Sequence, residues 1–149
     1  METKRFKPLF DKLYLILLIP TLFLMLGVTA LIFVFPEPAA IFIIIAVDLF
    51  VAYFFVSPLF GYVELRENSL FIKYGFFLKK EIPYEKIRET SKKRKFYSDS
   101  MMSLKNSFEH VNIKYNAFDV TSISVVDNDA FALALEERLV RNSKKRGTV

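Results

Sequence analysis

The pattern of hydrophobic and polar positions begins with two long apolar runs. These runs, Leu13–Phe35 and Ala39–Phe60, are separated only by Pro36-Glu37-Pro38. Each exceeds the roughly 20 residues that an α-helix needs to cross a hydrocarbon core of about 30 Å. Because proline removes a backbone donor and fixes φ, the two prolines end one helix and delay the next. The pattern therefore predicts a transmembrane helical hairpin over residues 13–60.

Two buried core helices of a soluble protein are the alternative, but they would need a large surrounding domain. Only about 90 residues follow the hairpin, which is enough for one small domain. Lys and Arg exceed Asp and Glu in residues 1–12 and again beyond Gly61, whereas the turn holds only Glu37. Positively charged flanks face the cytoplasm. We therefore expect a bacterial cell-membrane protein with both termini and the soluble domain in the cytoplasm, and residues 1–12 as a basic arm at the headgroup level.

Asp48 is the only charged residue within the two runs. It lies about 13 Å from the outer edge of the second run at a rise of 1.5 Å per residue, which is near the middle of a bilayer. A charge there costs at least ~2.5–3.5 kcal/mol on insertion scales. We expect either a neutral carboxyl bonded to Thr21 or Thr29, or a contact with a partner, such as another membrane protein or a second copy in a homo-oligomer. Asp48 is therefore a candidate partner-binding residue.

From Gly61 the pattern changes to short alternating segments rich in β-branched and aromatic residues, which predict strands with turns between them. A helix follows, with Asp127 as its N-cap and Phe131, Leu135 and Leu139 on one apolar stripe. It ends near Asn142, and residues 143–149 form a basic tail. The seven expected strands are Gly61–Arg66, Ser69–Tyr74, Leu78–Ile82, Lys86–Thr90, Met101–Lys105, His110–Tyr115 and Val120–Val126.

Two segments resemble the bacterial membrane-anchored family of pleckstrin-homology-like (PH-like) domains. The first, Ser69–Ile87, contains the family's "IPY..I" segment. The second has Ile123-Ser124, Asp127 and Phe131 where the family has "IS..D...F", with Val125 in place of a usual proline. The resemblance implies a PH-like α+β domain over residues 61–142, a seven-stranded bent sheet or barrel capped by the terminal helix. By pattern alone, a plain antiparallel sheet with a terminal helix fits nearly as well.

Within that family, the layout, length and basic tail are most similar to immunity proteins that protect a bacterium from its own sublancin-like bacteriocin. This closer resemblance implies a non-enzymatic function in antibiotic resistance, with the bacteriocin or its membrane target as the partner. Fold alone does not transfer function. An accessory or scaffold subunit of a membrane complex and a lipid-sensing adaptor are the alternatives.

The chemistry-bearing residues argue against an enzyme. There is no cysteine, no HExxH, no Walker loop and no glycine-rich phosphate cradle, and the only histidine, His110, is expected at the surface of a strand. We expect no catalytic residues, no metal and no cofactor. A basic loop, whose residues Lys92, Lys93, Arg94 and Lys95 precede Phe96 and Tyr97, is a candidate contact for anionic lipid or a partner, or else a solvated loop. Nucleic acid is not an expected partner because the domain is tethered to a bilayer.

Overall fold

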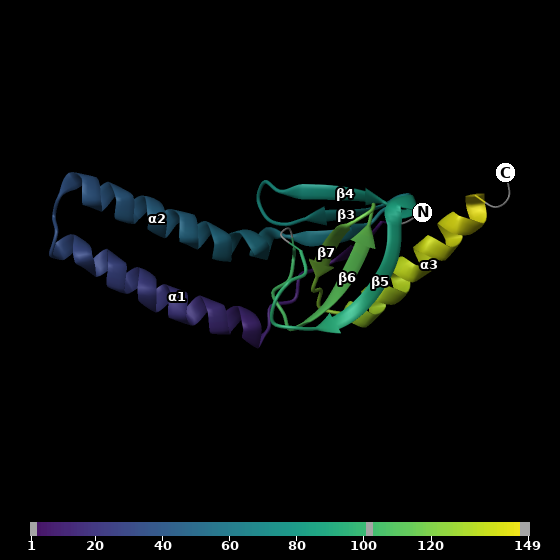
Figure 1. Cartoon of the computed structure of the whole chain (residues 1–149), viewed down its shortest axis with the longest axis horizontal. Helices are drawn as coiled ribbons and strands as arrows, with labels where there is room; N and C mark the ends of the chain where they lie inside the picture. Colours follow the sequence, from purple (N-terminus) through teal and green to yellow (C-terminus); the bar gives the residue numbers. More distant parts are fainter. Residues whose placement is uncertain (1–2, 101–102, 147–149) are drawn as a thin grey trace.

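The computed structural model describes residues 3–100 and 103–146, and within these residues the chain forms two parts (Figure 1). Two long helices lie side by side at one end of the molecule. Seven strands in two sheets and a third helix form a domain at the other end. The third helix extends away from the first two, so loops form the end of the domain that adjoins the helical pair.

The two apolar runs are helical, as predicted. Helix α1 covers Lys12–Ala30 and continues as a 3₁₀ turn, η1, over Leu31–Phe33. Helix α2 covers Pro38–Val56 and ends in a second 3₁₀ turn, η2, over Ser57–Phe60. Pro38 occupies the first turn of α2, where its missing N–H leaves no hydrogen bond unmade. With their 3₁₀ turns, the two helices contain 22 and 23 residues and are long and apolar enough to cross a membrane.

Most apolar side chains of these helices are not covered by the domain, and Leu13 in the first turn of α1 is an exception at 3% exposed. In each helix, no residue of the most apolar 18-residue stretch is buried, and the side chains of Phe23 and Phe42 are 72% and 74% exposed. Soluble proteins rarely expose contiguous apolar surface on this scale. The alternative of two buried core helices is therefore wrong.

Two antiparallel sheets pack around one hydrophobic core. The first has the order β1-β2-β3-β4 and the second the order β5-β6-β7. Core residues such as Leu65 and Ile113 are fully buried. The strands are β1 (Lys4–Phe6), β2 (Tyr62–Leu65), β3 (Ser69–Lys73), β4 (Lys79–Pro83), β5 (Ile87–Arg94), β6 (Glu109–Tyr115) and β7 (Asp119–Ile123), with a 3₁₀ turn, η3 (Tyr84–Lys86), between β4 and β5. The predicted fold class, two apolar helices before a small seven-stranded domain with a terminal helix, is confirmed.

One observed strand, β1, was not predicted, and one predicted strand is not formed. Residues 4–6 of the basic arm form β1, which pairs antiparallel with Val63–Leu65 of β2, so this part of the arm belongs to the sheet of the domain. Phe6 is only 9% exposed and its ring meets that of Phe131 edge to face at 5.2 Å. The burial of this aromatic ring and the covering of the β2 edge together explain the placement.

The predicted strand Met101–Lys105 is not formed within the described residues. Leu104 makes one isolated bridge to Ile123 and is 1% exposed, while residues 101–102 lie outside the described part of the chain. The basic segment, in contrast, is not a loop. Strand β5 continues through Arg94 because Lys92, Lys93 and Arg94 pair in register with the first residues of β6.

The terminal helix, α3, covers Asn128–Arg146, so it continues into the predicted basic tail. Its start is as predicted, because the Asp127 carboxylate accepts a hydrogen bond of 2.8 Å from the backbone N–H of Ala130. Phe131 and Leu135 are fully buried and Leu139 packs partly buried against the same core. The apolar stripe thus binds α3 to the sheets as predicted.

Candidate membrane-facing site

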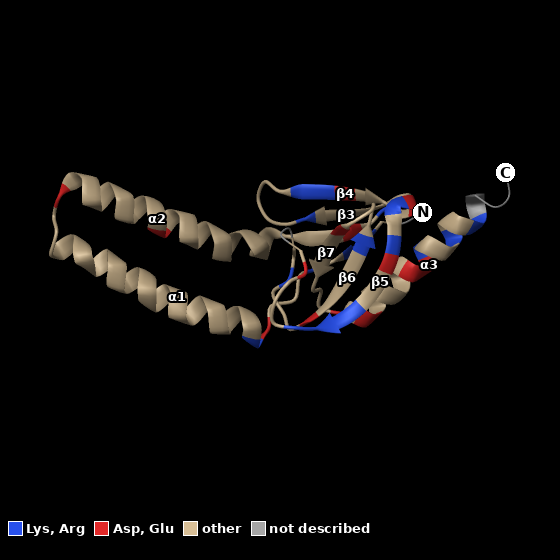
Figure 2. Cartoon of the chain, in the orientation of Figure 1, with Lys and Arg blue, Asp and Glu red and all other residues tan. Residues whose placement is uncertain are grey.

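The end of the domain that adjoins α1 and α2 carries the charged and apolar side chains of most interest. We call it the helix-proximal end and define it by Asp11, Ser57, the β3–β4 loop (residues 75–78), and residues 95–100 and 103–108. Figure 2 shows that Lys, Arg, Asp and Glu gather on the domain and α3, whereas α1 and α2 are almost free of charge. The helix-proximal end is therefore the boundary between an apolar part and a charged part of the molecule.

Asp11 joins the start of α1 to the domain. Its Oδ1 accepts a hydrogen bond of 2.8 Å from the backbone N–H of Leu13, which caps α1. Its Oδ2 accepts one of 2.6 Å from the hydroxyl of Ser107 and one of 3.2 Å from the N–H of Phe108. Partial burial raises the pKa of Asp11, but these three bonds and the nearby charge of Lys105 outweigh it and hold the pKa below its ordinary value. The first helix is thus fixed to the domain by an ionised side chain.

The end of α2 is joined to the β3–β4 loop. Gly75 packs so closely on Ser57 that a Cβ at position 75 would lie 1.9 Å from the Ser57 hydroxyl oxygen. The same hydroxyl accepts a hydrogen bond of 3.3 Å from the N–H of Phe76. The Phe76 ring lies 4.5 Å from that of Phe60, and the Phe77 ring lies 6.2 Å from that of Tyr53. The loop therefore lies along the last turns of α2 (Figure 1).

Sequence reasoning placed residues 75–77 between two strands and Leu78 at the start of the second strand, and it missed the contact of this segment with α2. The signal was present, because Phe76, Phe77 and Leu78 are three consecutive large apolar residues in a turn, where polar residues are usual. They are 41%, 80% and 55% exposed. An exposed apolar loop beside a membrane-length helix marks a candidate contact surface.

Most of the predicted basic site is paired with acids of the domain itself. Lys92 forms an ion pair with Asp129 at the start of α3. Lys93 and Lys95 lie 2.9 Å and 3.9 Å from the carboxylate oxygens of Asp99.

Arg94 differs from the three lysines. It has no carboxylate of the described residues within ion-pair distance, and it is exposed. Phe96 and Tyr97, which follow in the chain, are 59% and 60% exposed. Arg94 is therefore the member of the basic run whose charge is available to a ligand.

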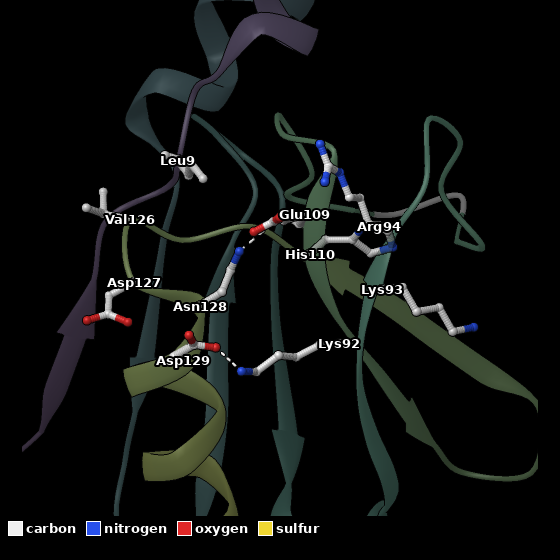
Figure 3. A pocket seen from close by; sticks show the side chains of 10 residues that line it. All are labelled: Leu9, Lys92, Lys93, Arg94, Glu109, His110, Val126, Asp127, Asn128 and Asp129. Carbon is white, nitrogen blue, oxygen red and sulfur yellow. Dashed lines mark hydrogen bonds and ion pairs between the residues drawn. The ribbon is translucent and has the colours of Figure 1, made fainter.

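A cavity of about 470 Å³ opens beside this run, between the ends of β5 and β6 and the first turn of α3 (Figure 3). Polar side chains that line the cavity bond to other residues of its wall. Lys92 forms an ion pair with Asp129, and the Asn128 amide donates a hydrogen bond of 3.2 Å to the Glu109 carbonyl. Three basic and three acidic side chains line it, so their formal charges cancel. It is lined by Leu9, Lys92, Lys93, Arg94, Glu109, His110, Val126, Asp127, Asn128 and Asp129.

The prediction that His110 lies at the surface is wrong. Its side chain is 1% exposed, its Nδ1 lies 3.1 Å from the carbonyl oxygen of Phe108, and its Nε2 has no partner among the described residues. Residues 95–100 and 103–108 lie over this face of β6, where Asn112 donates a hydrogen bond of 2.7 Å to Asp99. Burial lowers the pKa of His110, which keeps the imidazole neutral in the folded protein.

Asp48 faces the first helix. Its Oδ2 lies 2.6 Å from the hydroxyl oxygen of Thr29, which is one of the two threonines expected as its partner. The other, Thr21, bonds to the carbonyl of Leu17 in its own helix over 2.7 Å. Asp48 belongs to the middle of α2 and the basic run to β5, so the structure places these two candidate sites in separate parts of the molecule (Figure 1). Among the described residues, no group of three or more His, Asp or Glu side chains could hold a metal ion.

The protein has a small bent-sheet domain closed by a carboxyl-terminal helix, and two helices of membrane-spanning length precede this domain. Its class is therefore a PH-like domain that follows two apolar helices. The comparison with family models gives the family. The model described as "Bacterial PH domain" matches residues 61–139, more than half of the chain, and the protein therefore belongs to the bacterial PH domain family. No curated protein and no solved structure matched the chain. PH domains are generally non-catalytic interaction modules.

Proposed function

We propose that the protein is a membrane-anchored, non-catalytic binding module whose PH-like domain is held against the cytoplasmic face of a bacterial cell membrane. The observation that carries this proposal is the double attachment of the domain to the helical pair. Asp11 attaches the start of α1 through Ser107, and Gly75 attaches the end of α2 through Ser57. A domain attached at both points keeps one fixed end toward the bilayer.

The pairing of β1 with β2 supports the hairpin topology. Residues 4–6 precede α1 and residues 63–65 follow α2, yet the two segments are adjacent strands of one sheet. Both ends of the hairpin must then lie on the same side of a membrane. The basic residues on that side favour the cytoplasm.

The lipid and partner contacts that we propose lie at the helix-proximal end and at Arg94, which directly precedes it in the chain. Arg94 supplies a charge without an internal partner, and near an anionic surface a basic residue contributes about 1 kcal/mol. The three paired lysines contribute less to binding an anionic surface, because the carboxylates of Asp129 and Asp99 offset their charge. We therefore propose an adaptor or scaffold subunit of a membrane complex, with membrane lipids and a cytoplasmic or membrane protein as partners.

Topology reporters at the two ends test the proposal. A reporter that is active only in the cytoplasm, fused in turn to the amino and the carboxyl terminus, should be active in both fusions. A reporter active only outside the membrane should be inactive in both. An external amino terminus with an internal carboxyl terminus would mean that one run alone spans, and the hairpin topology would be wrong.

A second candidate function is immunity to a bacteriocin. It is supported by the resemblance in layout, length and basic tail to immunity proteins for sublancin-like bacteriocins. The hairpin would protect the cell by binding rather than by destroying the toxin. It would bind the toxin, or cover the toxin's membrane target, at a stoichiometry near one.

A killing assay tests this second function. Expression of the protein in a sensitive bacterium should reduce bacteriocin killing, and Asp48→Leu should lose protection at equal membrane abundance while Asp48→Asn retains more of it. Full protection by Asp48→Leu would remove Asp48 as the contact. Unreduced killing with the unaltered protein would remove the immunity function and leave the adaptor function standing.

A further inference from the structure

The β3–β4 loop has the composition of a membrane-interface anchor. Its tip, Phe76-Phe77-Leu78, is exposed, with Phe77 80% exposed and Leu78 55% exposed. Lys73 and Lys79 stand on either side of the tip and are directly opposite each other in the pairing of β3 with β4. Figure 2 shows the resulting positive charge at the start of β4, where the strand leaves the loop. An apolar tip between two long cationic side chains matches the order of acyl chains and headgroups in a leaflet.

The position of the loop along α2 gives its depth. The Phe77 ring is 6.2 Å from the ring of Tyr53, and Tyr53 lies seven residues before Phe60, where the apolar segment ends. Because residues 57–60 form the 3₁₀ turn η2, this corresponds to about 12 Å, at 1.5 Å per α-helical residue and about 2 Å per 3₁₀ residue. If α2 spans a bilayer up to Phe60, Phe77 then lies below the headgroups among the first part of the acyl chains, close to the burial of about 5–10 Å that interfacial side chains reach.

The loop is held in this position by the protein itself. Gly75 leaves no room for a side chain against Ser57, and the Phe76 N–H bonds to the Ser57 hydroxyl. The Tyr74 N–H closes the turn with a hydrogen bond of 2.8 Å to the Leu78 carbonyl. A rigid loop loses little conformational freedom when it inserts, which favours binding.

We propose that the β3–β4 loop is a third membrane contact, which inserts Phe77 and Leu78 into the leaflet around α2 and places Lys73 and Lys79 among anionic headgroups. The inference rests on the proposed membrane anchoring and adds to it the orientation of the domain. Lipid is the occupant because the loop continues the exposed apolar surface of α2, whose Phe50 and Phe54 are 63% and 59% exposed. A bilayer that surrounds α2 up to its end also surrounds the loop.

Single tryptophans test the insertion, because the natural chain contains none. We would prepare Phe77→Trp and Leu78→Trp in the full-length protein, with two matched controls. Phe23→Trp in the middle of α1 reports the bilayer interior, and Phe118→Trp, at a 96% exposed position in the β6–β7 turn, reports water. Each variant is reconstituted in phosphatidylethanolamine–phosphatidylglycerol vesicles that contain lipids spin-labelled either near the headgroup or deep in the chain.

The proposal predicts a blue-shifted emission for Phe77→Trp and Leu78→Trp relative to Phe118→Trp. It also predicts stronger quenching of both by the shallow label than by the deep one. Phe23→Trp should show the reverse order, and Phe118→Trp should be quenched by neither label. If Phe77→Trp and Leu78→Trp behave like Phe118→Trp while Phe23→Trp is quenched, the loop inference is wrong and the membrane anchoring stands. If Phe23→Trp is also unquenched, the anchoring itself is wrong.

A blue shift of Phe77→Trp without quenching by either label would show that protein, either a partner or a second copy, covers the loop, and this would overturn the lipid assignment. The charge part of the proposal has its own test. Replacing phosphatidylglycerol by phosphatidylcholine should reduce the quenching of Phe77→Trp, and Lys73→Gln with Lys79→Gln should remove that dependence. A dependence that is unchanged in the double variant would exclude the two lysines as the anionic-lipid contact.

Discussion

The hydroxyl oxygen of Thr29 in α1 lies 2.6 Å from Oδ2 of Asp48 in α2 and 2.8 Å from the carbonyl oxygen of Met25. A hydroxyl has one hydrogen and so makes one linear hydrogen bond as a donor. The single hydrogen of the Thr29 hydroxyl is therefore shared between the Asp48 carboxyl of α2 and the Met25 carbonyl of its own helix. The bond to Asp48 joins the two helices within the apolar region.

The first prediction follows from this bond. Asp48→Asn retains a side-chain oxygen that accepts the hydrogen bond from Thr29 and should leave the helix pair nearly as stable. Thr29→Val removes the hydroxyl with little change of shape, and it should destabilise the pair by about 1 kcal/mol, the usual size of such bonds in membranes. Unfolding in mixed micelles with rising SDS fraction measures the difference. Thr21→Val is the matched control, because Thr21 bonds only within its own helix. An equal loss in both threonine variants would contradict the interhelical bond.

The second prediction concerns the anchoring of α3. Phe131 is fully buried against the core and contacts Phe6, so Phe131→Ala should destabilise the domain by about 3–5 kcal/mol. Leu133→Ala, on the same helix but 63% exposed, is the control and should have little effect. Limited proteolysis of the membrane-bound protein should cleave the Phe131 variant in its domain much faster than the control. Equal rates would show that α3 does not stabilise the sheets.

The third prediction tests the arm as part of the domain. Phe6 lies in the core, so Phe6→Ala should destabilise the domain by about 2–4 kcal/mol, somewhat less than a central core residue because β1 is an edge strand. Lys7→Ala, one residue further at an exposed position, is the control. Backbone hydrogen exchange of β2 measures the effect, because β2 pairs with β1. Unchanged exchange in the Phe6 variant would contradict the pairing of the arm with the sheet.

The fourth prediction is a dependence of stability on pH. Burial lowers the pKa of His110 in the folded state below its ordinary value of 6.5, so the unfolded chain binds a proton at this residue more readily. The free energy of unfolding should therefore be at its full value above about pH 6.5 and should fall as the pH decreases below it. In His110→Gln, the midpoint of thermal unfolding should change less between about pH 7.5 and about pH 5.5 than it does in the unaltered protein.

Asp11 provides a check on this assignment. Its pKa is lowered from 3.8, so the stability that it contributes is lost only at more acidic pH, as the carboxylate becomes protonated. The two residues therefore act in separate pH ranges. A decline between neutral and mildly acidic pH that persists in His110→Gln would exclude His110 as its cause.

The sequence by itself determined the features that depend on local pattern and length. The helical pair follows from two apolar runs long enough to cross a bilayer, because a helix rises by a fixed 1.5 Å per residue. The start of α3 follows from Asp127, whose side chain caps the helix three residues on, and its packing follows from the spacing of Phe131 and Leu135. Asp48 was recognisable as a paired residue, because an isolated acid in an apolar run needs a polar partner.

Only the tertiary structure decided which distant segments meet. The pairing of residues 4–6 with β2 brings together segments separated by the whole hairpin. A strand of three residues is too short for its hydrophobic pattern to predict this pairing. The same holds for His110, which is buried beneath residues 95–100 and 103–108, and for Phe77, which lies against Tyr53. Local periodicity records which side of a strand a residue occupies, but burial and contact depend on what covers that side. This is decided by packing across the chain.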